Sequence, residues 1–151
     1  SNSANGKIKN SNILDLYAGI GSFGFECISR GASEVLFFEK DEEALKNLKK
    51  NIKNLKIENQ SRIFSGDIEE CFKNFLFKKK FNIIFFDPPY RDNKYKKIIE
   101  MIKKKNILNK NHVVIIHREK NSEKSISKYL DIIENRTYGR SELFFARFFW
   151  N

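Results

Sequence analysis

The tetrapeptide Asp87-Pro88-Pro89-Tyr90 joins an acid, two rigid residues and an aromatic ring directly after an apolar run at residues 81–86. Such a run predicts a buried strand, so the tetrapeptide is expected at the sheet edge where open α/β folds bind their ligands. The Asp87 carboxylate and the Pro88 carbonyl accept hydrogen bonds, and Tyr90 offers a flat face for stacking. We expect this loop to bind a planar heterocycle with an exocyclic NH2 group. The alternative is an ordinary strand-to-helix turn, because Asp and Pro are common turn residues.

A glycine-rich segment lies upstream, where apolar residues 13–16 lead into Gly19-Ile20-Gly21-Ser22-Phe23-Gly24. Between a strand and a helix, the pattern G-x-G-x-x-G lets the backbone turn tightly and approach a ligand beside free helix N–H groups. Taken alone, it also fits a simple tight turn or a dinucleotide-binding fold. Asp15 disfavours a dinucleotide, because a carboxylate at the strand end repels a pyrophosphate but could hold a cationic or zwitterionic amino-acid group.

Two further acids follow predicted strands. Glu39 ends the apolar run at residues 35–38, and its carboxylate could accept both hydroxyls of a ribose. Asp67 follows residues 62–66 and could accept a hydrogen bond from an adenine amino group. Each acid taken alone is more typical of a helix N-cap. Together with the glycine segment, they predict a pocket for an adenosine that carries an amino-acid tail.

In this order, the motifs resemble the S-adenosylmethionine-dependent methyltransferases of the Rossmann-like class, in which D-P-P-Y marks enzymes that methylate exocyclic amines of bases. The chain is most similar to the RsmD family of bacterial 16S ribosomal RNA guanine-N2 methyltransferases. The family pattern D-x-x-A-G-x-G-x-x-G-x-E-x-x-S-R-G-A matches residues 15–32, its E-x-D strand end matches Glu39-Lys40-Asp41, and D-P-P-[YF] matches residues 87–90.

The resemblance implies S-adenosylmethionine as cofactor, S-adenosylhomocysteine as product, no metal, and 16S ribosomal RNA, naked or in an assembling small subunit, as the partner of a monomer. The predicted catalytic residues are Asp87, Pro88, Pro89 and Tyr90. The predicted cofactor-binding residues are Asp15, Tyr17, Gly19, Gly21, Gly24, Glu39, Lys40, Asp67 and Ile68. Two alternatives stay open: an adenine-N6 methyltransferase acting on DNA or RNA, and a non-catalytic RNA-binding subunit that keeps the fold.

The predicted fold class is α/β, a Rossmann-like methyltransferase fold with a doubly wound, mostly parallel seven-stranded sheet and a C-terminal antiparallel hairpin. Predicted strands span residues 12–17, 34–39, 62–65, 81–86, 112–117, 131–138 and 141–150. Predicted helices span residues 22–30, 41–55, 68–77, 94–105 and 122–129. The last strand is expected at the sheet edge. His112 and His117 are expected in core or edge positions, not as general bases.

Composition limits the class of protein. With 29 Lys and Arg against 19 acids, the formal charge is +10, which favours polyanionic partners such as RNA. Two cysteines without paired spacing predict neither a zinc site nor a disulfide. We expect a single catalytic domain over residues 1–151 that is soluble and cytoplasmic. RsmD members usually begin with a basic segment of several dozen residues, and only Ser1 to Asn12 precede the glycine strand here, so we expect that segment to be absent.

Overall fold

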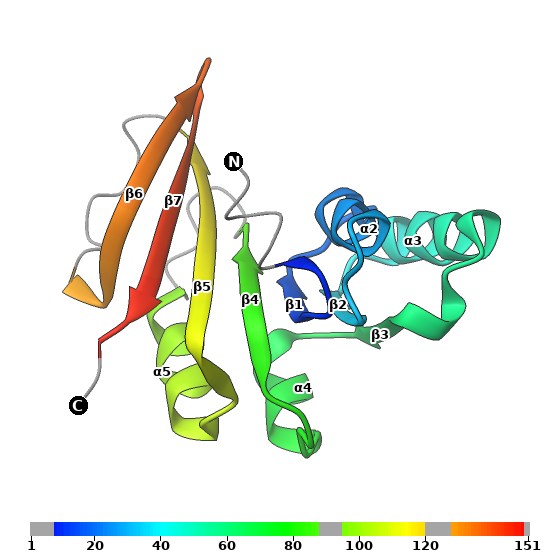
Figure 1. Ribbon diagram of the computed structural model, residues 1–151. Coiled ribbons are helices and arrows are strands. Elements are labelled where there is room, and N and C mark those ends of the chain that lie inside the picture. Colours follow the sequence, from blue (N-terminus) through cyan, green and yellow to red (C-terminus); the bar gives the residue numbers. More distant parts are fainter. Residues whose placement is uncertain (1–7, 88–94, 120–127, 150–151) are drawn as a thin grey trace.

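A computed structural model describes residues 8–87, 95–119 and 128–149 of the chain. Their core is one seven-stranded sheet in the order β3-β2-β1-β4-β5-β7-β6 (Figure 1). The first five strands in this order are parallel, and β7 runs antiparallel to both β5 and β6. The predicted doubly wound sheet with a terminal hairpin is confirmed. The strands are β1 (Asn12–Leu16), β2 (Glu34–Glu39), β3 (Ser61–Ser65), β4 (Phe81–Phe86), β5 (Leu108–Glu119), β6 (Leu130–Tyr138) and β7 (Ser141–Phe148).

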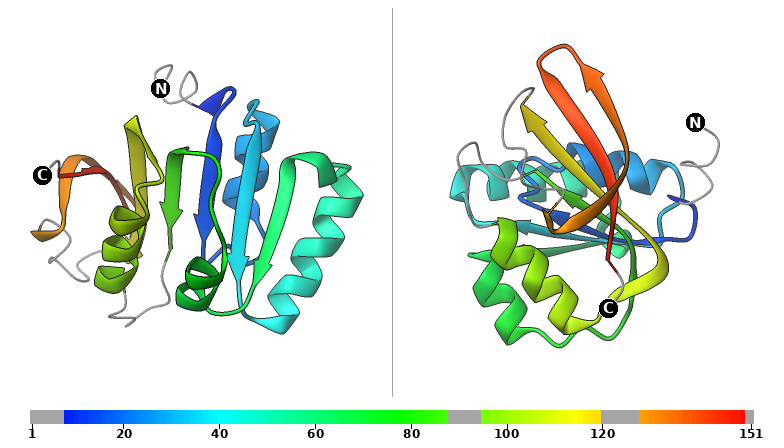
Figure 2. Two further views of the ribbon diagram at one scale, coloured as in Figure 1. Left: turned by 90° about the horizontal axis from the view of Figure 1, so that it is seen from below. Right: turned by 90° about the vertical axis from the view of Figure 1, so that its left-hand side faces the viewer.

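Helices cover both faces of the parallel strands (Figure 2). One face carries α2 (Ser22–Ser29) and α3 (Glu42–Leu55), and the other carries α4 (Ile68–Asn74) and α5 (Tyr95–Lys105). A short 3-10 turn, η1 (Glu58–Gln60), joins α3 to β3. None of the helices in the described ranges has the length and hydrophobicity that a membrane crossing requires.

Helix α3 shows how the sequence sets these elements. Leu45, Leu48 and Ile52 recur at helical spacing and are buried, while the lysines of the helix face solvent. Asp41 caps the helix, because its carboxylate accepts a hydrogen bond of 2.8 Å from the Ala44 N–H. The helix ends at Lys56, whose backbone is left-handed. The burial of one apolar stripe therefore fixes the helix against the sheet.

The core consists of two hydrophobic clusters, one on each face of the sheet. Phe38, Phe72 and Ile98 belong to the cluster beneath α4 and α5, whereas Phe37 and Leu48 belong to the cluster beneath α2 and α3. Because β1 and β2 are buried on both faces, the ends of the strands are held in fixed positions. The loops that follow those strands are therefore mounted on a rigid base.

Several element boundaries differ from the prediction, including those of β1, α4 and β5. Strand β1 ends at Leu16 because Tyr17 adopts a left-handed backbone with φ of 59°. Helix α4 ends at Asn74, not at residue 77, because Phe75 is extended and its ring packs against Phe64 at a centroid distance of 4.8 Å. Strand β5 begins at Leu108, before the predicted residue 112, with a register shift in its pairing with β4.

The prediction that the last strand lies at the sheet edge is wrong. Strand β7 pairs with β5 on one side and with β6 on the other, so β6 forms the edge. The hairpin gives β7 both partners, and the β7 residues Ala146 and Phe148 are accordingly buried. The predicted helix at residues 122–129 and the end of the last predicted strand lie largely outside the described residues.

Candidate active site

The carboxyl ends of five parallel strands meet along one edge of the sheet. Strand β1 lies between β2 and β4, and the chain leaves β1 toward β2 but later returns on the other side with β4. Leu16 is paired with Phe38 of β2 and with Phe86 of β4, so the loops that follow these residues are neighbours. Doubly wound sheets bind ligands at such a change of direction. Most of the predicted site residues lie along this edge.

The glycine loop turns through left-handed backbone conformations and leaves one side open. Gly19 has φ of 60° and Gly21 has φ of 94°, values that disfavour other residues. A Cβ atom added at Gly19 would meet nothing within 4 Å, whereas one at Gly24 would lie 2.3 Å from the Phe37 ring. Gly24 therefore lets α2 pack closely on β2, and Gly19 is the glycine at which a ligand has room to approach.

The Glu39 carboxylate binds the glycine loop to the end of β2. Its Oε1 accepts a hydrogen bond of 2.7 Å from the Gly19 N–H, and its Oε2 accepts bonds of 3.0 and 2.8 Å from the N–H groups of Lys40 and Asp41. The sequence predicts Glu39 as a ribose acceptor, which stays a prediction. The structure adds that Glu39 positions the loop, because a carboxylate has about four acceptor sites and three are used.

Asp15 is the most unusual acid of the site. Its side chain is 1% exposed, and among the described residues neither oxygen forms a hydrogen bond. Burial raises the pKa of Asp15 well above its ordinary value of 3.8; the Gly24 N–H lowers it without the geometry of a full hydrogen bond, and the nearby charges of Asp87 and Glu39 raise it further. A buried, unpartnered acid costs free energy, and functional sites are where such costs are retained.

The third strand contributes Asp67, which occupies the N-cap position of α4. Its side chain makes no capping hydrogen bond, so the usual structural reason for an Asp at this position does not apply. The preceding Gly66 donates its N–H to the Glu39 carbonyl at 3.0 Å, which holds the β3 end next to the β2 end. Of the other predicted cofactor residues here, Ile68 is buried in the core and the Lys40 side chain is exposed.

Asp87 directly follows β4 and contacts a histidine that was predicted to be structural. The Oδ1 atom of Asp87 lies 3.1 Å from Nδ1 of His117 on the neighbouring strand β5. Both side chains are partly exposed, at 43% for Asp87 and 36% for His117. Asp87 Oδ2 has no hydrogen-bond partner within the described part of the chain. Pro88, Pro89 and Tyr90 lie outside the described residues.

The other histidine has a structural role, as the sequence predicts. His112 is buried, and its Nδ1 lies 2.8 Å from the Asn109 carbonyl oxygen, so Nδ1 carries the proton. Its Nε2 accepts a hydrogen bond of 3.0 Å from the Phe148 N–H. Both ring nitrogens are therefore used to join the irregular start of β5 to the end of β7.

The electrostatics of the edge favour a positively charged ligand. Asp15 senses the charges of Asp87 and Glu39, so three carboxylates act on one small region. A pyrophosphate would add further negative charge, whereas a cationic ligand would offset the repulsion. Among the described residues, no group of three or more His, Cys, Asp and Glu side chains is arranged to hold a metal ion.

The sheet order, the change of direction at β1 and the antiparallel hairpin define a Rossmann-like methyltransferase fold. The crystal structure of a candidate methylase from Haemophilus influenzae superposes with a TM-score of 0.82 at 27% identity, covering 99% of this chain and 93% of that one. The family described as Conserved hypothetical protein 95 matches residues 2–147, and the chain belongs to this family. The predicted resemblance to RsmD is thereby confirmed.

Several curated relatives carry the name Ribosomal RNA small subunit methyltransferase D. The protein of Buchnera aphidicola from Acyrthosiphon pisum is 39% identical over 113 residues, which cover 75% of this chain and 58% of the relative. The protein of Haemophilus influenzae is 30% identical over 133 residues, which cover 87% of this chain and 69% of the relative. The chain thus spans about six tenths of the Buchnera protein's length.

Proposed function

We propose that residues 1–151 form a single catalytic domain that methylates the N2 amine of a guanine in small-subunit ribosomal RNA, with S-adenosylmethionine as the methyl donor. The observation that carries the proposal is the convergence of Asp15, Glu39 and Asp87 around the glycine loop. The names of the curated relatives support ribosomal RNA as the substrate. The net charge of +10 suits that polyanion.

The residues of the edge fit the cofactor. S-adenosylmethionine carries a sulfonium and an ammonium group, which suit a region of several carboxylates, and its amino-acid end fits beside the unpartnered Asp15 and the open side of Gly19. Glu39, which has about one acceptor site left, would accept a ribose hydroxyl. Asp67, with no capping bond, would accept from the adenine amine. When bound, the cofactor supplies an activated methyl group for transfer to nitrogen.

The protein's own residues must make the guanine N2 amine more nucleophilic. The lone pair of a guanine N2 is delocalised into the ring, so acceptors on its N–H bonds raise the electron density at nitrogen. Asp87 Oδ2 and the Pro88 carbonyl are assigned this role, with Tyr90 stacking on a base that has left its helix. His117 occupies Oδ1 and so orients the carboxylate. In this proposal Asp87 also takes up the proton that the amine releases.

Replacement of Asp15 by asparagine is expected to stabilise the chain and to weaken cofactor binding. Because the pKa of Asp15 is raised on folding, the folded state holds its proton more tightly, and wild-type stability falls as pH rises above 3.8 toward the folded pKa. The asparagine side chain does not titrate, so the advantage of the variant should grow from pH 4 to pH 7.5 and reach on the order of 1 kcal/mol, or about 2–4 °C in Tm.

Thermal unfolding at both pH values and calorimetric titration with S-adenosylhomocysteine measure the two effects of the Asp15 replacement. Asp41→Asn is the matched control, because it makes the same change from carboxylate to amide at an exposed helix cap. A variant that loses stability at pH 7.5 relative to wild type, or that binds S-adenosylhomocysteine as tightly, contradicts the role given to Asp15.

The proposed activity is tested by incubating the chain with small-subunit ribosomal RNA and labelled S-adenosylmethionine, with and without ribosomal proteins. Mass spectrometry of the digested RNA then identifies the modified base. Transfer to guanine N2 is the expected result, and the two RNA preparations show whether the substrate is naked RNA or a particle. Transfer to adenine N6 would favour the alternative enzyme, for which the same acceptor pair is suited. Cofactor binding without transfer to either base would favour a non-catalytic subunit.

A further inference from the structure

A second concave site lies at the opposite end of the sheet from the candidate active site. It is a cavity of about 270 Å³ between the face of β2 and β3 and the loop that joins α4 to β4. Glu34 and Phe81, which line it, are the first residues of β2 and β4, whereas Glu39 and Phe86 are the last. At about 3.3 Å per residue, the two ends of a strand lie roughly 17 Å apart. The cavity is therefore separate from the glycine loop and Asp87.

The cavity exists because α4 is too short to cover this part of the sheet. The helix ends at Asn74 after seven residues, and the loop at residues 75–80 covers the strand starts in its place. Leu36 and Arg62 are paired across β2 and β3, so their side chains lie on the same face and form the floor of the cavity. The loop contributes Phe75 and Lys78 as walls.

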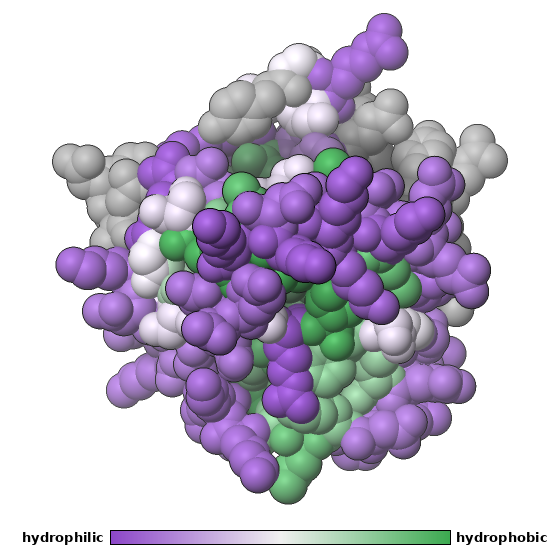
Figure 3. Space-filling view, turned by 90° about the vertical axis from the view of Figure 1, so that its right-hand side faces the viewer, coloured by the Kyte–Doolittle hydropathy of each residue, from purple (hydrophilic) through white to green (hydrophobic). Residues whose placement is uncertain are grey.

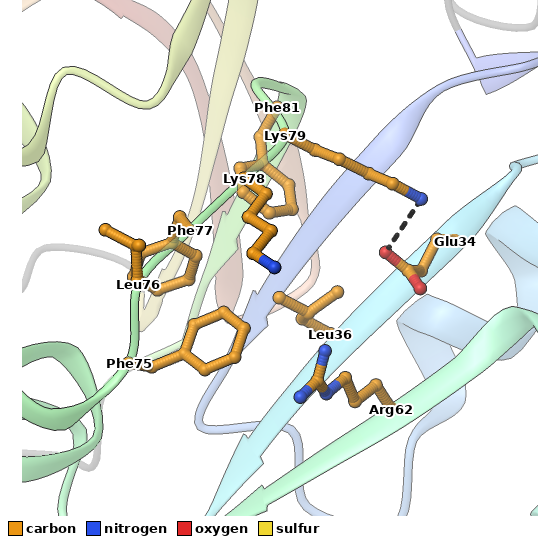
Figure 4. A pocket seen from close by; sticks show the side chains of 9 residues that line it. All are labelled: Glu34, Leu36, Arg62, Phe75, Leu76, Phe77, Lys78, Lys79 and Phe81. Atoms are coloured by element: carbon orange, nitrogen blue, oxygen red, sulfur yellow. Dashed lines mark ion pairs between the residues drawn. The ribbon is translucent and has the colours of Figure 1, made fainter.

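Two positive charges in the cavity have no acidic partner among the residues that the structure describes. Figure 4 shows the Lys78 ammonium and the Arg62 guanidinium on opposite sides of Leu36, each turned toward the middle of the cavity. Lys79 is paired with Glu34 at 3.6 Å, but within the described ranges neither Arg62 nor Lys78 forms an ion pair. Two uncompensated like charges that face each other are stabilised when an anion binds between them.

Aromatic surface adjoins these charges. The Arg62 guanidinium lies 4.7 Å from the centroid of the Phe75 ring and 5.3 Å from that of Phe64, so the rings hold it in place. Leu76 next to them is 76% exposed. Figure 3 shows hydrophobic side chains reaching the surface on the side of the molecule where β3 forms the sheet edge, surrounded by polar ones. A flat ring and a guanidinium plane together suit a stacked base.

We propose that this cavity binds one unpaired nucleotide of an RNA, with its phosphate at Arg62 and Lys78 and its base on Phe75. The cavity is slightly smaller than the roughly 300 Å³ at which sites for whole small molecules begin, which suits one base with its phosphate. An acidic peptide would satisfy the charges but would offer no planar base to stack beside Phe75 and the Arg62 guanidinium. This inference rests on the proposed function, because that function identifies the polyanion as RNA.

The test compares two variants with the same loss of charge. Arg62→Gln with Lys78→Gln removes the two cations of the cavity that form no ion pair within the described ranges, and leaves Lys79 paired with Glu34. Lys46→Gln with Lys50→Gln removes two exposed lysines of α3, on the other face of the sheet. Binding of a fluorescein-labelled, unstructured RNA of about ten nucleotides is measured by anisotropy across a salt series. The cavity variant should bind on the order of tenfold more weakly, and its salt slope should fall by about 1.4, as expected for two lost contacts to a single strand. The control variant should stay close to wild type.

Ultraviolet cross-linking of the same RNA carrying 4-thiouridine locates the contact. Mass spectrometry should find cross-links in the peptide that contains Phe75, and these should be lost in the cavity variant. The proposal is overturned if both variants bind RNA equally weakly, or if wild type does not bind RNA. Binding of poly-glutamate is measured in the same way, and an equal loss of poly-glutamate binding in the cavity variant would also overturn it, because the site would then select charge alone. So would self-association of wild type that the cavity variant abolishes, since a second copy would then cover the cavity. This assay contains no cofactor, so RNA binding at the cavity can be found even if methyl transfer fails. Methyl transfer can likewise be found even if the cavity does not bind RNA, and the two proposals can therefore fail separately.

Discussion

Replacement of Asp87 by alanine is expected to reduce methyl transfer by a factor on the order of 100 or more, because the carboxylate acts mainly as the transition state forms. Affinity for S-adenosylhomocysteine should stay nearly unchanged, since Asp87 is assigned to the target amine. The decisive measurement is single-turnover transfer to small-subunit RNA or particles, with calorimetric titration of the same protein. Near-wild-type transfer by Asp87→Ala would show that the assigned mechanism is wrong.

Variants of two neighbouring residues distinguish orientation of the Asp87 carboxylate from binding of the target base. His117→Ala removes the contact to Asp87 Oδ1 and should lower the rate of transfer with little change in KM, whereas His117→Asn keeps a donor there and should restore most of the rate. Tyr90→Ala should instead weaken binding of the flipped base, where stacking contributes about 1–3 kcal/mol.

The fold follows from patterns that are local in the sequence. Alternating apolar runs and helical periodicity predict the parallel strands and the helices between them, as in α3 with its buried Leu45, Leu48 and Ile52. The errors arise where contacts between distant residues decide the outcome. Phe75 leaves α4 because its ring packs on Phe64, and β7 lies inside the sheet because β6 returns to its outer side. Neither contact has a local signature.

The site shows the same division. The acids at the strand ends are predictable, because Glu39 ends an apolar run, Asp87 follows one, and Asp15 is the acid within one. The role of His117 is not predictable from the sequence, because it depends on the strand register. The register pairs Phe86 with Ile116 and so sets His117 beside Asp87. A model of the parallel register would have found it. The packing role of Gly24 likewise requires knowing that Phe37 lies beneath α2.

Glu39 is the residue for which structure changes the sequence-based prediction most. The sequence offers its carboxylate to the ribose hydroxyls, but in the structure the same carboxylate holds the N–H of Gly19 at 2.7 Å. The group that is proposed to accept from the ribose is therefore also the group that holds the glycine loop. Its loss should both remove an acceptor from the ligand and release the loop that surrounds the ligand.

Glu39→Ala is accordingly expected to weaken S-adenosylhomocysteine binding by at least several-fold, since lost charge-assisted hydrogen bonds cost about 1.5–3 kcal/mol. Calorimetric titration measures the affinity, and hydrogen exchange of the Gly19 amide, which should become faster, measures the release of the loop. Glu43→Ala is the matched control, because it removes an exposed acid from the first turn of α3 nearby. Faster exchange with unchanged affinity would restrict Glu39 to bracing the loop. Weaker binding with unchanged exchange would make it a ligand acceptor alone, and only both changes together support the double role.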